Sequence, residues 1–252
     1  MKGTIFQKPL EFKLNVEGES WRQGDGVQGT LLVKNHGSEA ISLKDIHIHL
    51  AQGRLSKVRS KTEGAFKIQA SAPISTPDDA EKFLAAGGEL QLPWTFQTDR
   101  NCAITDVSTS LYILYGQGDA ADKLGQIQLT FHPYPIIQEF LKTLTIDFRF
   151  VIKYQKFVKE RLEIKLEPPT AKAFNFLECL FLYFYIEGDV INVSYAFQVK
   201  KLDASAASVD ITKQSKTFDQ SLAPHEYLMP SGRVNYTFFE AAIREAMKVV
   251  GA

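Results

Sequence analysis

Three stretches decide the fold of this chain: QGDGVQGTLLV at residues 23–33, LPWTF at residues 92–96 and SLYILY at residues 110–115. Each stretch is typical of a strand that alternates its side chains between two faces, and each follows a turn marked by glycine or proline. No helical pattern separates these stretches. The three stretches therefore predict antiparallel sheets in the first half of the chain.

The same period continues on either side of these stretches. Leu10, Phe12, Leu14 and Val16 alternate with polar neighbours, as do the isoleucines and the leucine of residues 46–50. Closely spaced strands with glycine- and asparagine-rich turns between them are typical of an antiparallel sandwich. The pattern stops at residues 71–88, where prolines and acidic residues predict a long surface loop.

A change of period at Pro135 predicts a short amphipathic helix and a domain boundary. The apolar residues from Ile136 to Leu144 fall at helical spacing, and proline is favoured in the first turn of a helix. We therefore expect two domains, residues 1–133 and 134–252.

Strand patterns resume beyond this helix. Residues 148–154 and 162–166 each alternate, and the break in the pattern between them predicts a bulge or turn near Phe157. Residues 174–186 form an apolar spine, and residues 190–201 are expected to pair with it across a hairpin at Gly188.

The C-terminal region is expected to contain a loop and then a helix. Residues 204–230 are polar and weakly patterned, which predicts a loop-rich segment. Thr237 and Glu240 fit a capping box, and the helix that follows carries an apolar stripe that includes Phe239 and Ile243. Gly251 is well placed to end this helix.

Composition excludes several classes of protein. Lys and Arg together number 29, as do Asp and Glu, so the net charge is zero and gives no bulk attraction to nucleic acid or to an anionic membrane. A local patch stays compatible with this balance. Zero net charge also favours self-association, so a homo-oligomer is an expectation.

The remaining bulk signals point to an ordinary cytoplasmic protein. The two cysteines form no disulfide framework and no Cys-x-x-Cys pair. The first nine residues lack the apolar core of a signal peptide. The most apolar run, residues 177–186, is far shorter than the roughly 20 residues that span a bilayer. A cytoplasmic location is the expectation.

The sequence offers no catalytic constellation. It contains no Gly-x-Ser-x-Gly elbow, and neither Cys102 nor Cys179 has a glycine-rich, oxyanion-forming context. The Gly24-Asp25-Gly26 turn is followed by neither a lysine nor a helix, so it is not a phosphate-binding loop. We expect no enzyme, no catalytic residue and no cofactor.

Three histidines are the only metal-ligand candidates with suggestive spacing. His47 and His49 share one face of a predicted strand, and His36 lies nearby in sequence. No third ligand stands at a recognised spacing, so an exposed strand face is the favoured interpretation. The Asp78-Asp79 pair beside Pro77 is expected to serve solubility. No metal site is predicted.

One stretch is locally basic and an aromatic run follows it. Three glutamates dilute the basic stretch, so a solvated strand face is favoured over nucleic-acid binding. The same face is also compatible with an acidic protein partner. The aromatic run, residues 180–186, is apolar on both faces, which predicts a central strand covered on both sides. The cations of the stretch are Lys153, Lys156, Lys159, Arg161 and Lys165.

Three landmarks in this order resemble the bacterial sporulation-control protein family, a branch of the arrestin clan. Residues 21–33 look like its turn-then-strand opening, residues 84–96 like its Ala-Gly-Glu and Pro-Phe-x-Phe strand, and residues 132–141 like its His-Pro-Leu-Val linker helix. The likeness covers residues 10–150. Gly24 stands where the family has proline, and no Pro-Pro-x-Tyr motif for a ubiquitin ligase occurs.

The resemblance implies an all-β fold of two antiparallel immunoglobulin-like, arrestin-type sandwiches with a short linker helix and a C-terminal helix. It also implies a non-enzymatic scaffold that regulates cell development or sporulation through protein contacts, with β-augmentation at an exposed edge as one docking mode. The alternative is a small-ligand or metal-binding sandwich protein with a site between its domains. A carbohydrate-binding module is disfavoured by the missing export signal.

Overall fold

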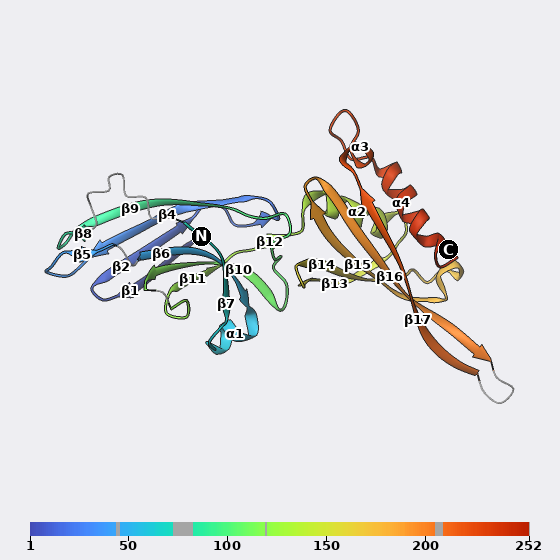
Figure 1. Cartoon of the computed structure of the whole chain (residues 1–252), viewed down its shortest axis with the longest axis horizontal. Coiled ribbons are helices and arrows are strands. Elements are labelled where there is room, and N and C mark those ends of the chain that lie inside the picture. Colours follow the sequence, from blue (N-terminus) through green and yellow to red (C-terminus); the bar gives the residue numbers. More distant parts are fainter. Residues whose placement is uncertain (44–45, 73–82, 119, 205–208, 252) are drawn as a thin grey trace. The chain divides into compact units, whose positions relative to one another are not determined.

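The structure is a computed structural model of the 252-residue chain, and it describes residues 1–43, 46–72, 83–118, 120–204 and 209–251. The chain divides into two compact units, Met1–His132 and Pro133–Ala252. The first unit is a sandwich of two antiparallel sheets, and the second is one antiparallel sheet with helices packed on it (Figure 1). The expected all-β class is confirmed.

Two four-stranded sheets build the first unit. One has the strand order β1-β2-β4-β9 and the other β11-β10-β6-β7. The short strands β3 and β12 pair in parallel, and β5 pairs with β8. The bounds are β1 Lys2–Gln7, β2 Leu10–Val16, β3 Trp21–Arg22, β4 Gly26–Asn35, β5 Ile41–Ser42, β6 Ile46–Arg54, α1 Leu55–Ser60, β7 Phe66–Ala72, β8 Phe83–Leu84, β9 Glu89–Gln97, β10 Thr109–Gln117, β11 Gly125–Gln128 and β12 Phe131–His132.

The core of the first unit follows the alternation of its strands. In β4 every second residue is buried, and β9 runs antiparallel beside it with its own buried set in register. Burial of these side chains is worth about 1.5–3 kcal/mol each for a large aliphatic or aromatic residue. The largest buried contributors include Phe12, Leu31, Trp94, Phe96 and Tyr115.

A close approach explains why glycine stands at the centre of β4. Gly29 lies between its partners Val16 on β2 and Trp94 on β9. A Cβ atom at Gly29 would lie 2.0 Å from the backbone oxygen of Asn15 and 2.7 Å from the Trp94 ring. Both contacts are far inside van der Waals distance, so this position accepts no side chain without moving the strand.

We predict that Gly29→Ala destabilises the protein by about 3 kcal/mol, because the new methyl group overpacks a backbone contact that cannot relax. The matched control is Gly26→Ala in the same strand, where a Cβ atom meets only the Gln97 side-chain oxygen at 3.7 Å. Urea unfolding followed by tryptophan fluorescence measures both. Equal stability of the two variants would contradict this account of Gly29.

The second unit is a five-stranded meander in which each strand pairs with the next along the chain, β13-β14-β15-β16-β17. β15 is therefore central, and β13 and β17 are the edges. The bounds are α2 Pro135–Ile146, β13 Val151–Val158, β14 Arg161–Glu167, the 3-10 turn η1 Lys172–Phe174, β15 Leu177–Glu187, β16 Val190–Ala204, β17 Val209–Leu222, α3 Pro224–Tyr227 and α4 Tyr236–Lys248.

An aromatic cluster joins the helices to this sheet. The Phe140 ring on α2 meets Phe184 on β15 at 5.7 Å and Phe239 on α4 at 5.2 Å between centroids, both edge-on. Edge-to-face pairs at this separation add about 0.5–1.5 kcal/mol beyond their buried area. Phe140 and Phe239 are fully buried, so this cluster fixes α2 and α4 on one face of the sheet.

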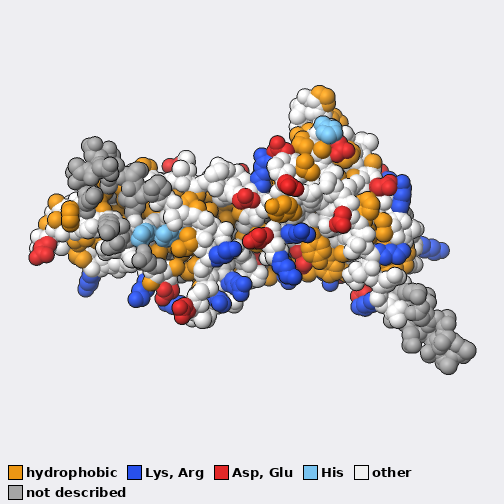
Figure 2. Space-filling view, viewed as in Figure 1, with side chains coloured by type: hydrophobic (Ala, Val, Ile, Leu, Met, Phe, Trp, Pro, Cys, Tyr) orange, Lys and Arg blue, Asp and Glu red, His pale blue; other side chains and the backbone are white. Residues whose placement is uncertain are grey.

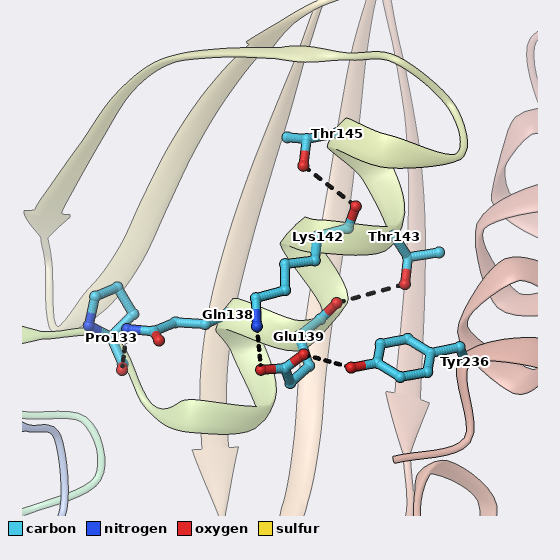
Figure 3. Close-up of polar contacts among 7 residues, drawn as sticks. All are labelled: Pro133, Gln138, Glu139, Lys142, Thr143, Thr145 and Tyr236. Carbon is cyan, nitrogen blue, oxygen red and sulfur yellow. Dashed lines mark hydrogen bonds and ion pairs between the residues drawn. The ribbon is translucent and has the colours of Figure 1, made fainter.

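Polar contacts join the same two helices at the surface (Figure 3). The Tyr236 hydroxyl donates to one carboxylate oxygen of Glu139 at 2.6 Å, and the Lys142 ammonium donates to the other at 2.7 Å. The carboxylate raises the pKa of Tyr236, because it accepts the phenolic hydrogen bond. The start of α4 is thereby tied to the middle of α2.

The second unit differs from the expected second sandwich. Within its described residues, α2 and α4 occupy the face that a second sheet would cover. Each helix carries an apolar stripe wide enough to bury one side of the sheet, with Leu141 and Leu144 on α2 and Ile243 and Met247 on α4 all buried. In this unit helices cover the apolar face of the sheet, whereas in the first unit a second sheet covers it.

Two local predictions for this unit are wrong. Residues 209–222, expected to be loop-rich, form the edge strand β17, whose largely polar side chains gave no apolar alternation. The cap of α4 is Asn235 rather than Thr237, since its side-chain oxygen accepts from the Phe238 amide at 3.2 Å. The predicted linker helix at Pro135 and the hairpin at Gly188 are confirmed.

Candidate functional site

Among the described residues, helices cover only one face of the second unit's sheet, and we call the other face the open face. In β15 the even-numbered residues from Leu180 to Ile186 are buried under α2 and α4, while the odd-numbered residues point the other way. Of these, Phe181 and Tyr183 are half-buried, and Tyr185 is 41% exposed. The open face is thus an aromatic surface in contact with solvent.

Strand register brings the basic stretch onto this aromatic surface. Tyr154 pairs with Lys165, which pairs with Phe181, and one row further along Lys156 pairs with Glu163. Because directly paired residues in an antiparallel sheet point to the same face, these side chains lie together on the open face. Residues separated by more than 20 positions in the sequence thus form one continuous surface.

Two lysines stand over aromatic rings at the centre of the open face. The ammonium of Lys156 lies 4.3 Å from the centroid of the Tyr154 ring, and that of Lys165 lies 5.6 Å from the Phe181 ring. Neither lysine forms an ion pair within the part of the chain that the structure describes. Their aliphatic stems cover ring surface while their charges stay available to a partner.

A carboxylate organises the tyrosines of this surface. The Tyr154 hydroxyl donates to Glu163 at 2.9 Å. Burial and this hydrogen bond raise the pKa of Tyr154 to about 12, and burial together with the Glu163 charge also raises the pKa of Tyr183. Both phenols therefore stay neutral at physiological pH and serve as hydrogen-bonding groups rather than bases.

Two ion pairs lie at the end of the open face near the first residues of β15. Lys153, at a bulge in β13, pairs with Glu167 at 2.6 Å, and Lys213 pairs with Glu178 at 2.7 Å. The Lys213 hydrogen bond lowers the pKa of Glu178, whose other carboxylate oxygen is buried and has no hydrogen-bond partner among the described residues. Both acids are engaged within the sheet by lysines.

This arrangement corrects the expectation that the aromatic run is covered on both sides. Among the described residues, helices cover one side of β15 only, and lysine stems partly shield the rings on the other. The basic stretch is a solvated strand face, as the sequence indicated, except that Lys159 lies in the turn between β13 and β14.

The three histidines considered as metal ligands do not form one site among the described residues. His36 bonds to Glu11 at 2.9 Å, while His47 and His49 stack at 5.2 Å between ring centroids, with His49 held by Ser71 at 2.7 Å. No group of three His, Cys, Asp or Glu side chains suited to a metal ion occurs in the described ranges. Asp78 and Asp79 lie outside those ranges.

Both thiols are held in the unreactive form. Burial raises the pKa of Cys102 to about 12, and burial also raises that of Cys179, which lies on the open face beside Glu178. A thiolate is the nucleophilic form of cysteine, so neither side chain is activated at neutral pH.

We predict that Ellman's reagent labels Cys102 slowly in the native protein at pH 8 and rapidly in denaturant, because the folded environment suppresses its thiolate. A Cys179→Ser variant isolates the signal of Cys102, and Cys102→Ser serves as the reciprocal control. Native labelling as fast as that of a free thiol would contradict this description.

The fold and the open face define a two-unit β protein that combines a sandwich with a helix-backed sheet, whose open face carries aromatic and lysine side chains. No protein-family model and no curated protein matches the sequence. In the described part of the chain, no helix is long and apolar enough to cross a membrane.

Solved structures do resemble the chain. Spo0M, a sporulation control protein from Bacillus subtilis, superposes with a TM-score of 0.63 at 14% identity, covering 95% of this chain and 98% of its own. The likeness shows a shared fold through both units. The DNA glycosylase AlkC of Pseudomonas fluorescens, bound to DNA with an abasic-site analogue, reaches only 0.30 at 12% identity over 49% of this chain and 30% of its own, too low to bear on the fold.

Proposed function

We propose that this chain is a non-enzymatic regulatory protein that acts through protein contacts in a sporulation-type developmental programme, and that the open face is its docking surface. The observation that carries the proposal is the likeness to a sporulation control protein over nearly the full length of both chains. A likeness confined to one unit would be compatible with any sandwich protein. Kinship with arrestin-type scaffolds belongs to the same proposal.

The chemistry of the open face supports the docking part of this proposal. Interface centres are enriched in aromatic residues, and tyrosine is among the side chains that contribute most to binding. Tyr183 and Tyr185 meet this description, with Lys156 and Lys165 beside them. Tyr183 is already half-buried, so little conformational freedom is lost when a partner covers it.

The state of the ionisable groups supports the non-enzymatic part. Cys179, Tyr154 and Tyr183 on the open face all have a raised pKa, and so does Cys102 on the first unit. Each of these groups remains protonated at neutral pH. Nucleophilic or general-base catalysis needs the opposite shift. Protonated thiols and phenols are compatible with a binding role.

We predict that a photo-reactive benzoylphenylalanine at Tyr185 crosslinks a specific protein in the native host. The matched control carries the same group at Tyr236, which has a similar exposure of 48% but lies at the start of α4. Adding Tyr183→Thr beside the Tyr185 probe should lower the crosslink at least about fivefold, because loss of one buried aromatic anchor costs more than 1 kcal/mol. Mass spectrometry of the crosslinked product identifies the partner.

The regulatory part has its own readout. Deleting the gene should change the fraction of host cells that complete the developmental programme, and re-expression of the wild-type chain but not of Tyr183→Thr should restore it. Thermal unfolding of the purified variant checks that it is folded. An identical set of crosslinks at Tyr185 and Tyr236, or full restoration by the variant, would contradict the proposed role of the open face.

A further inference from the structure

A basic cluster on the first unit is independent of the open face. Residues 54–67 hold five cations and one acid, although the chain as a whole is neutral. Four of the cations, Arg54, Lys57, Arg59 and Lys61, border or lie in α1, and we call this group the basic cap. Figure 2 shows Lys and Arg side chains gathered around α1 on the first unit, with a few acidic ones among them.

Packing of α1 directs these charges outward. Leu55 and Val58 pack against a small outer core of Ala51, Tyr112 and Leu114, so the apolar side of the helix is occupied. Arg54, Arg59 and Lys61 are exposed, and Lys57 is half-buried with its ammonium near the Gly64 turn. The cap is therefore a charged surface on a helix that is already anchored.

The charge of the cap is not neutralised by the fold. None of its four side chains forms an ion pair within the described residues. Elsewhere on the surface, lysines such as Lys13, Lys142 and Lys248 each have a carboxylate within 3.0 Å. Four neighbouring cations without counterions repel one another, and binding an anionic partner relieves this repulsion.

We propose that the basic cap binds an acidic segment of a partner protein. Two arginines supply the planar forks that pair with carboxylates through two hydrogen bonds each. An anionic membrane is less well matched, because a surface helix that binds lipid inserts an apolar face, whereas Leu55 and Val58 of α1 are committed to the outer core. Because the apolar side chains of α1 are already packed in the outer core, an acidic protein segment is favoured over a membrane.

The test measures binding of a fluorescein-labelled octaglutamate peptide to the full chain by fluorescence anisotropy, with octaglutamine as the neutral peptide. We expect binding of octaglutamate only, weakening as sodium chloride is raised. The triple variant Lys57→Gln/Arg59→Gln/Lys61→Asn should weaken it at least about tenfold, the sum of three partly screened charge contacts. Asparagine is used at Lys61 because its backbone is left-handed, with φ 51°.

A matched control removes the same charges elsewhere. Lys2→Gln/Lys172→Gln/Arg233→Gln takes two lysines and one arginine from exposed positions outside the cap and should leave binding unchanged. Lys57→Arg/Arg59→Lys keeps the cap's charge and should retain binding, and thermal unfolding verifies that each variant is folded.

Three outcomes would overturn the proposal. One is equal loss of peptide binding in the cap variant and the matched control. Another is no binding of octaglutamate at low salt. The third is cap-dependent sedimentation with phosphatidylglycerol vesicles in the absence of peptide binding, which would assign the cap to a membrane. None of these bears on crosslinking through Tyr185, so this proposal and the proposed function fail separately.

Discussion

Each large sheet of this chain has a strongly apolar face that must be buried. The element that covers this face determines the architecture of each unit. In the first unit the two sheets cover one another, with Phe12, Leu31 and Tyr115 fully buried between them. In the second unit α2 and α4 do the covering through the Phe140 cluster. A helix pair needs only one side of a sheet, so the other side of β15 is left for aromatic and basic side chains.

Alternation in the sequence was enough to predict most of the first unit. β2, β4 and β9 stand where apolar side chains recur at every second position, and Gly29 is explained by its neighbours rather than by a turn. The second unit was less predictable. β17 has only Phe218 and Leu222 as apolar markers among its described side chains, because an edge strand of this kind shows most of its residues to water.

The open face was predicted in pieces and not as a whole. The basic stretch and the aromatic run were both visible, yet only register places Lys165 beside Phe181. The apolar pattern also predicted that both faces of β15 are buried, because the same aromatic residue types occur at half-buried and at fully buried positions. Counting charges along the sequence could have found the basic cap, because its four cations fall between residues 54 and 61. No sequence pattern shows which of these cations have counterions.

The connectivity of the two units has a kinetic consequence. Every pairing in the second sheet joins strands adjacent in sequence, so each can close as a hairpin as soon as its residues exist. The first unit must instead bring residue 26 against residue 97 before β4 finds β9. Loop closure over such separations slows folding, whereas local pairing speeds it. The second unit, which leaves the ribosome last, is thus the unit whose sheet forms through local pairings and is expected to fold faster.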